Sequence, residues 1–132
     1  MSDDFDRVKS ILVDLDLSIV QEDAAEELVV VQDEEAGIVN LLIDCEDPLL
    51  VLEQHIFRVP EAASPKLYER LLQINRTTVH GAFVLDEEGE NVFFRDTLQL
   101  PTLDPAELES SIAALSLALA ENAGELLELA GH

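Results

Sequence analysis

Apolar residues in the first fifteen positions recur at helical spacing. The stripe is formed by Phe5, Val8, Ile11, Leu12 and Leu15. Residues three and four positions apart share one face of a helix, and polar residues occupy most of the positions between these apolar ones. Ser2 is a suitable N-cap, and the acidic first turn suits the positive end of the helix dipole. The pattern therefore predicts a helix over residues 2–15.

Runs of aliphatic and β-branched residues replace the helical pattern after this segment. They cover 28–31, 38–43 and 49–59, with a shorter stretch of strand character at 17–20. Connections rich in Asp, Glu, Gly and Pro separate them at 32–37 and 45–48. The third run is apolar at every position from 49 to 52, so its first half should be covered on both faces. Gln54, His55 and Arg58 indicate a wetter second half.

The second half of the chain combines two helices with a hairpin. Ser64 and Pro65 form an N-cap followed by a proline at the first helical position. The expected face of this helix holds Leu67, Tyr68, Leu71, Leu72 and Asn75. Strands follow at 79–85 and 91–100, around an acidic turn. Asp104 and Glu107 form a capping-box pattern that begins a last helix. Its stripe holds Leu108, Ile112, Leu115, Leu119 and Leu126, and residues 122–124 are expected to end or bend it.

The order α-β-β-β-α-β-β-α, with short turns between strands, is typical of antiparallel pairing. We therefore expect an α+β fold in which helices pack on an antiparallel sheet. The length of 132 residues fits one domain over 1–132.

Charge narrows the possible partners. Seven Lys and Arg against 29 Asp and Glu give a net charge of −22. Such a surface repels nucleic acids and anionic membranes, so neither is expected as a partner. Three interpretations stay open: adaptation to high salt, recognition of a basic partner, and high solubility. The spread of acids along the whole chain favours salt adaptation. The acidic N-terminal sequence and the lack of a long apolar run predict a cytoplasmic protein.

Motifs for catalysis are missing from the sequence. It has no phosphate loop, dinucleotide fingerprint, zinc-protease helix or nucleophile elbow. We therefore expect no enzyme activity, catalytic residue, cofactor or metal. The acidic turns at 33–35 and 86–90 do not fit a calcium loop and are interpreted as solvated hairpin tips. A ligand- or metal-responsive regulatory domain using these acidic loops stays as the alternative hypothesis.

Two single residues invite a chemical interpretation. Cys45 is the only cysteine, which excludes an intrachain disulfide, and its acidic neighbours raise a thiol pKa. A structural cysteine at a strand end is therefore favoured. Asp96 occupies an otherwise apolar face of the strand 91–100. It is interpreted as a buried carboxylate paired with Arg76 or Arg95, or as the mark of a β-bulge, in preference to a site acid.

Several motifs resemble those of a known family. They are Leu-Leu-Gln-Ile-Asn-Arg at 71–76, His-Gly-Ala-Phe-Val-Leu-Asp at 80–86, Phe-Arg-Asp-Thr-Leu at 94–98 and Leu-Asp at 103–104. The pattern resembles the YbjN family, which is similar in fold to type III secretion chaperones of the CesT/Tir kind. This resemblance implies an acidic, usually dimeric domain that binds protein segments and has no catalytic residues. Asn75, Gly81, Phe83 and Asp96 are then interpreted as fold-determining.

The combined hypothesis is a non-enzymatic, chaperone-like homodimer that binds a segment of a protein partner. The apolar stretch 113–120 is expected to support self-association. Two chains bring a charge of −44 together (2 × −22), so dimerisation should strengthen with salt. A partner segment could add to a strand edge or lie against the first helix and sheet. The candidate contact residues are Phe5, Val8, Ile11, Val51, Ile56 and Phe57.

Overall fold

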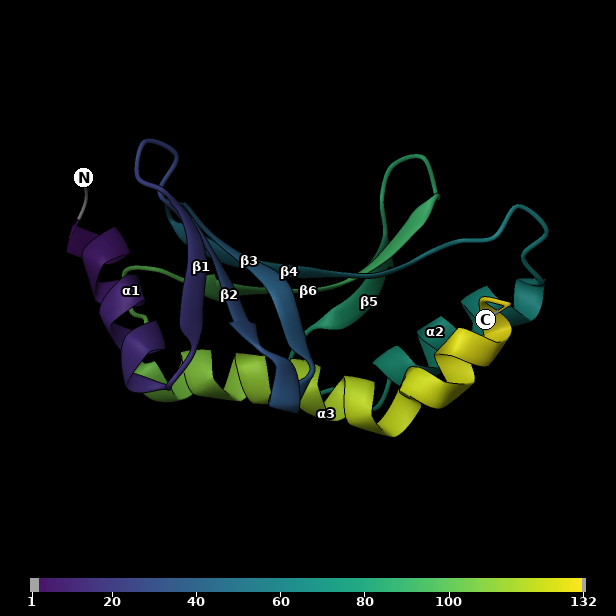
Figure 1. Cartoon of the computed structure of the whole chain (residues 1–132). Helices are drawn as coiled ribbons and strands as arrows, with labels where there is room; N and C mark the ends of the chain where they lie inside the picture. Colours follow the sequence, from purple (N-terminus) through teal and green to yellow (C-terminus); the bar gives the residue numbers. More distant parts are fainter. Residues whose placement is uncertain (1–2, 132) are drawn as a thin grey trace.

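The computed structural model describes residues 3–131 and consists of one antiparallel sheet and three α-helices (Figure 1). The helices are α1 (Asp3–Asp14), α2 (Pro65–Asn75) and α3 (Pro105–Leu129), and a short 3-10 helix, η1, covers Glu34–Ala36. The strands are β1 (Ser18–Asp23), β2 (Leu28–Asp33), β3 (Ile38–Glu46), β4 (Leu49–Arg58), β5 (Ala82–Leu85) and β6 (Asn91–Gln99). Their order across the sheet is β1-β2-β3-β4-β6-β5. The α+β class is confirmed, and the predicted element order is found with one more strand before α2, because the strand character at 17–20 is realised as β1.

The long helix α3 runs beneath the sheet (Figure 1). Helix α1 lies at the β1 end, and α2 lies beside the C-terminal half of α3 at the other end. One continuous core joins the elements. Its fully buried side chains include Phe5, Val8, Leu12, Val29, Ile38, Leu41, Ile43, Leu50, Leu67, Leu100, Leu108 and Leu126. Burying each leucine or phenylalanine contributes about 1.5–3 kcal/mol, so this core dominates the stability.

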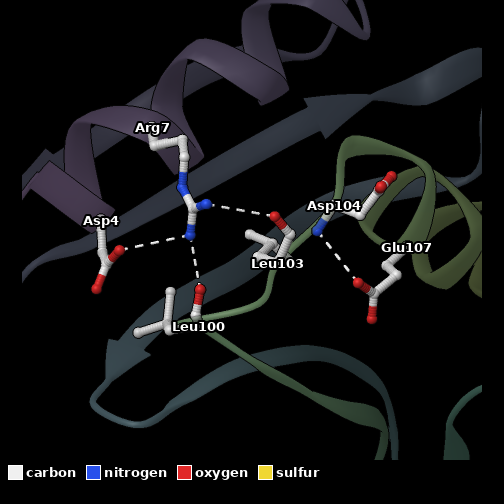
Figure 2. A network of polar contacts seen from close by, with 6 residues as sticks. All are labelled: Asp4, Arg7, Leu100, Leu103, Asp104 and Glu107. Atoms are coloured by element: carbon white, nitrogen blue, oxygen red, sulfur yellow. Dashed lines mark hydrogen bonds and ion pairs between the residues drawn. The ribbon is translucent and has the colours of Figure 1, made fainter.

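A polar network fixes α1 to the segment that leads into α3 (Figure 2). Arg7 donates from Nη2 to the carbonyl of Leu100 at 2.6 Å and from Nη1 to the carbonyl of Leu103 at 3.3 Å. The same guanidinium lies 3.4 Å from Asp4. The predicted cap Ser2 lies outside the described residues. Arg7 therefore links the first turns of the chain to residues about a hundred positions away.

The predicted caps of α2 and α3 are confirmed. The Ser64 hydroxyl accepts from the Lys66 N–H at 3.2 Å. Asp104 accepts from the Ala106 N–H at 2.7 Å and donates through its own N–H to Glu107 at 3.1 Å. Helix α3 continues through 122–124 without ending, and Figure 1 shows it bending in its C-terminal half.

Two expectations about the middle of the chain are wrong. The buried face of α2 holds Leu67, Leu71 and Ile74, whereas Leu72 is 72% exposed. A stripe that starts at Leu67 continues at positions four and seven further on, and Leu72 falls outside it. Val79 is 90% exposed and precedes the strand, which begins only at Ala82. Gly81 forces this late start because it has a φ of +77°, and a Cβ there would meet the Phe94 ring.

Candidate functional site

Strands β3 and β4 pair near their hairpin and then separate. The paired positions run from Glu46↔Leu49 to Leu42↔Glu53. Beyond Glu53, β4 continues beside β6 as far as Arg58. Figure 1 shows the start of β3 beside α3 while the end of β4 runs on toward the loop before α2. We call the space between them the β3–β4 slot.

Two bulges, one in each wall, open the β3–β4 slot. In β3, Val39 and Asn40 lie between the positions paired with Asp33 and Val31 of β2, and Asn40 has a φ of +54°. Asparagine accepts this left-handed conformation more readily than most residues. In β4, Ile56 is the extra residue between the positions paired with β6. A bulge bends its strand and strengthens the twist, so the two walls diverge.

Gln54 fills the apex of the β3–β4 slot. Its Oε1 accepts from the Val39 N–H at 3.1 Å, and its Nε2 donates to the Gly37 carbonyl at 3.1 Å. Gln54 is 4% exposed. The expectation that the second half of this strand is exposed to solvent is therefore wrong at this residue. A buried amide is stable only when its polar atoms are hydrogen-bonded, and here both ends are. The Gln54 side chain thus makes the hydrogen bonds to β3 and Gly37 that the backbone of a paired β4 residue would otherwise make.

The β3–β4 slot is apolar and carries no carboxylate. It has a volume of about 510 Å³ and is lined by Gly37, Val39, Asn40, Gln54, His55, Ile56, Phe57, Leu119, Ala123, Leu126 and Leu127. Leu119, Ala123, Leu126 and Leu127 of α3 form one apolar wall of this slot. His55 is the only titratable residue of the lining; its Nε2 lies 2.9 Å from Asn91 Oδ1. An uncharged lining contrasts with the rest of a chain whose net charge is −22.

The predicted partner-binding residues occupy different places. Phe5, Val8 and Ile11 are buried between α1 and the rest of the core, and Val51 is buried in the sheet. Their side chains therefore present little surface in the folded chain. Ile56 and Phe57 both line the β3–β4 slot, with Ile56 half-buried. Partner binding by all six stays a prediction, and the geometry brings only the last two together.

A second surface is defined by the distribution of charge. The two longest stretches without Asp or Glu are 70–85 and 110–120. Both line a shallow depression of about 100 Å³, through Thr77, Thr78 and Val79 on one side and Ala114, Leu117 and Ala118 of α3 on the other. Glu121 and Asn122 of α3 complete the lining. Val79 and Leu117 are respectively 90% and 59% exposed. We call the part formed by residues 77–79 with Ala114, Leu117 and Ala118 the acid-free face, and Glu121 lies at its border.

Asp96 is held by neither of the predicted arginines. Its Oδ2 accepts from the Ser111 hydroxyl at 2.7 Å, and His80 Nδ1 lies 3.8 Å from the same oxygen. Arg95 instead lies 3.4 Å from Glu53, and the bulge opposite β6 is in β4. Ser111 is 2% exposed, so this hydrogen bond joins the buried face of α3 to the sheet. Both explanations predicted for Asp96, an arginine partner and a bulge in its own strand, are therefore wrong, and its hydrogen-bond partner comes from a helix that sequence spacing does not indicate.

The acidic turn at 86–90 has a structural role. Asp86 accepts from the N–H groups of Glu90 and Asn91 at 2.8 and 3.2 Å. The Asn91 side chain also donates to it, and these hydrogen bonds hold the pKa of Asp86 below its usual value. Within residues 3–131, no group of three or more His, Cys, Asp or Glu could hold a metal ion. The regulatory alternative therefore has no metal site in the described part of the chain.

Cys45 is buried near carboxylates. Burial, with Glu27 and Asp44 close by, raises the pKa of its thiol to about 11. The thiolate is the reactive form of cysteine, and this environment disfavours it. A structural role is therefore the better description of this residue.

Sequence reasoning missed Asn40 and Gln54. One signal was available for Gln54: it follows Leu50 and Leu52 at alternate positions, which share one face of the strand. A polar residue continuing an apolar face indicates a buried polar partner. Asn40 gave no signal, because a bulge depends on pairing with another strand.

Comparisons with known proteins agree with the fold. A model of the CesT_Tir_1 family matches residues 1–132. YbjN from E. coli is similar in structure, with a TM-score of 0.68, 16% identity and coverage of 92% of each chain. The HopA1–SchA chaperone–effector complex gives a TM-score of 0.60 at 15% identity, over 88% of this chain and 91% of that chain. The Yersinia pestis type III secretion chaperone SycH, in complex with a fragment of YscM2, gives 0.60 at 14% identity, over 89% and 98%.

A search of curated protein sequences found no match. Within residues 3–131, none of the helices combines the length and apolarity needed to cross a lipid bilayer.

Proposed function

Because this chain belongs to the CesT_Tir_1 family, we propose that it binds segments of protein partners, as a homodimer and without catalysing a reaction. The observation that carries this proposal is the β3–β4 slot, an apolar groove without carboxylates on a strongly acidic chain. Apolar grooves of this size with a few polar groups are typical of binding sites. The related HopA1–SchA and SycH–YscM2 structures are complexes of a chaperone with a protein.

The homodimer is proposed to form through the acid-free face. Two copies with a charge of −22 each repel one another, so their contact must lie where carboxylates are few. The face offers Val79 and Leu117, both largely exposed, and both come from the long stretches without acids. Exposed apolar patches of this kind mark interaction sites.

Co-purification tests the binding function. The tagged chain is incubated with an extract of its own cells at low and at high salt. We expect a discrete partner that is retained at high salt, because apolar contacts are not screened. Many basic proteins, bound only at low salt, would mean that charge alone is responsible, and the proposal would be wrong.

Two matched variants locate the contact. Val39→Glu places a charge in the wall of the β3–β4 slot, and Val20→Glu places the same charge on the edge strand β1. Both valines are exposed strand residues, at 45% and 52%, so either variant should fold. We expect Val39→Glu to lose the partner and Val20→Glu to retain it. The reverse result would place binding at the β1 edge.

A further inference from the structure

We propose that the chain binds a protonated aliphatic amine in a groove between the end of α1, the η1 turn and the first half of α3. We call it the α1–α3 groove. It has a volume of about 270 Å³ and is lined by Leu15, Leu17, Asp33, Ala36, Ile38, Glu109, Ile112, Ala113 and Ser116. None of these residues lines the β3–β4 slot or the acid-free face. The inference therefore goes beyond the proposed function and does not depend on it.

The first argument is that the α1–α3 groove is formed by the fold itself. Its floor belongs to the core, since Leu17, Ile38 and Ile112 are buried. The Ser116 hydroxyl donates to the Ala36 carbonyl at 2.6 Å and so fixes η1 against α3. Figure 1 shows the end of α1 and the start of β1 beside the same part of α3. Concave sites that exist before the ligand arrives are typical of small-molecule binding.

The second argument is a pair of unpartnered carboxylates. Asp33 ends β2, and Glu109 lies in the second turn of α3. Within residues 3–131, neither side chain makes a hydrogen bond or an ion pair, and the described lining contains no lysine or arginine. Both carboxylates are thus available to a cation. The net charge of −22 also raises the concentration of cations around the chain.

The third argument is the chemistry of the remaining lining, which selects the kind of cation. The apolar part of the α1–α3 groove is aliphatic, and no aromatic ring lines it. Quaternary ammonium ions are recognised mainly through aromatic faces, which this lining does not offer. A primary ammonium group instead donates up to three hydrogen bonds, for which carboxylate oxygens are suitable acceptors, and methylene groups are stabilised against aliphatic side chains. An alkylammonium ion therefore matches both parts of the lining.

The α1–α3 groove also bears on the regulatory hypothesis drawn from the acidic loops. Asp33 belongs to the acidic turn at 33–35 on which that hypothesis was based. Within residues 3–131 the carboxylates form no metal site. The groove provides that hypothesis with an organic ligand in place of a metal ion.

A titration with hexylamine at pH 7 tests the inference, and propylamine keeps the charge but shortens the chain. Both amines are protonated at this pH, like the lysine side chain. Amide NMR spectra of the isotope-labelled full chain report the affinity and the location together. We expect saturable shifts centred on Ala36, Ile38 and Ala113 with hexylamine. Propylamine should bind at least about tenfold more weakly, because it buries three fewer methylene groups.

Two further compounds with six carbons test the charge. Hexanol keeps the apolar body without a charge, and hexanoate carries the opposite charge. We expect hexanol to bind at least about tenfold more weakly than hexylamine, because it lacks the charge-assisted hydrogen bonds. Hexanoate should not bind, because its carboxylate is repelled by those of the groove.

Matched double variants assign the carboxylates. Asp33→Asn with Glu109→Gln removes both from the α1–α3 groove, whereas Glu87→Gln with Glu88→Gln removes two exposed carboxylates from another turn. The two proteins have the same net charge, so attraction by charge alone affects them equally. We expect hexylamine to bind at least about tenfold more weakly to the first and to change by less than about twofold for the second.

A second variant keeps the test decisive should the first double variant fail to fold in circular dichroism. Ala113→Phe fills the α1–α3 groove from an exposed position of α3, and Ala120→Phe adds the same ring at an exposed position outside it. We expect at least about tenfold weaker binding of hexylamine to Ala113→Phe and a change of less than about twofold for Ala120→Phe.

Each other outcome overturns the inference. Equal binding of propylamine and hexylamine, or shifts spread over the acidic surface, would mean that net charge alone attracts the amine. Equal binding of hexanol would exclude a role of the carboxylates. Equal binding to the matched variants would place the amine outside the α1–α3 groove, and a lack of saturable binding of hexylamine would exclude the site.

Discussion

The side chain of Asn75 pairs with the backbone of Phe83 as a neighbouring strand would. The Phe83 N–H donates to Asn75 Oδ1 at 2.7 Å, and Asn75 Nδ2 donates to the Phe83 carbonyl at 3.0 Å. Asn75 is the last residue of α2, and Phe83 lies in the edge strand β5. One amide thus attaches a helix end to the sheet and covers the edge that β5 would otherwise offer.

Replacing Asn75 with alanine should destabilise the chain by about 1–3 kcal/mol, because both part-buried groups of Phe83 lose their partner. Urea unfolding followed by circular dichroism measures the change. Gln73→Ala, on the exposed face of the same helix, is the control and should change the free energy of unfolding by less than about 0.5 kcal/mol. Equal stability of the two variants would mean that the Asn75–Phe83 pair contributes nothing.

Asp44 should make stability depend on pH. Its Oδ1 is buried without a hydrogen-bond partner. Burial, with Glu46 and Glu26 nearby, raises the pKa of Asp44 from 3.8 to about 6. The folded chain therefore holds this proton more tightly than the unfolded chain, and the free energy of unfolding contributed by Asp44 falls as pH rises from about 4 to about 6.

Asp44→Asn should remove that contribution and be more stable than the unmodified chain at pH 7. Urea unfolding at pH 4, 5, 6 and 7 measures the difference between the two proteins. Asp47→Asn, in the adjoining exposed turn, removes the same formal charge and should keep the dependence. A difference that does not vary with pH would contradict the assignment to Asp44.

Dimerisation should strengthen as salt is added. Screening weakens the repulsion between two chains of −22 each and leaves apolar contacts at the acid-free face intact. Sedimentation velocity at increasing salt measures the dimer fraction. Leu117→Glu should shift the equilibrium toward monomer, and Val13→Glu, an equally exposed residue of α1, should not. A monomer at every salt concentration would show that the homodimer proposal is wrong.

Cys45 should react slowly with thiol reagents while the chain is folded. Its burial limits access, and a pKa of about 11 keeps the thiolate scarce at pH 8. Labelling with Ellman's reagent at pH 8 should therefore be much faster in guanidinium chloride than in buffer. Equal rates would mean that the thiol is accessible in the folded chain.

Local patterns in the sequence predicted most of the elements. Periodicity identifies α1 and α3, and the N-caps at Ser64 and Asp104 identify where α2 and α3 begin. These signals are local, because caps and stripes depend on residues within one or two turns. Leu72 was misplaced because several alignments of an apolar stripe fit a short helix equally well. Val79 was misplaced because the left-handed backbone of Gly81, which lies against Phe94, delays the start of β5.

The candidate site was predicted only in part. Ile56 and Phe57 were selected for their apolar character at a strand end, and both line the β3–β4 slot. Phe5, Val8 and Ile11 were selected as apolar residues of the first helix, and they lie in the core. Apolar character alone does not distinguish a buried residue from a contact residue, since both satisfy the same pattern.

The sequence by itself determined the α+β class, the order of the elements, the two capped helix starts and the strongly negative charge. The tertiary structure alone decided that β3 and β4 separate after Glu53, that Gln54 bridges them and that Ser111 meets Asp96. It also decided that the two longest stretches without acids share one face. The physical reason is that helices and caps depend on neighbouring residues, whereas bulges, slots and charge-free faces depend on segments brought together from distant parts of the chain.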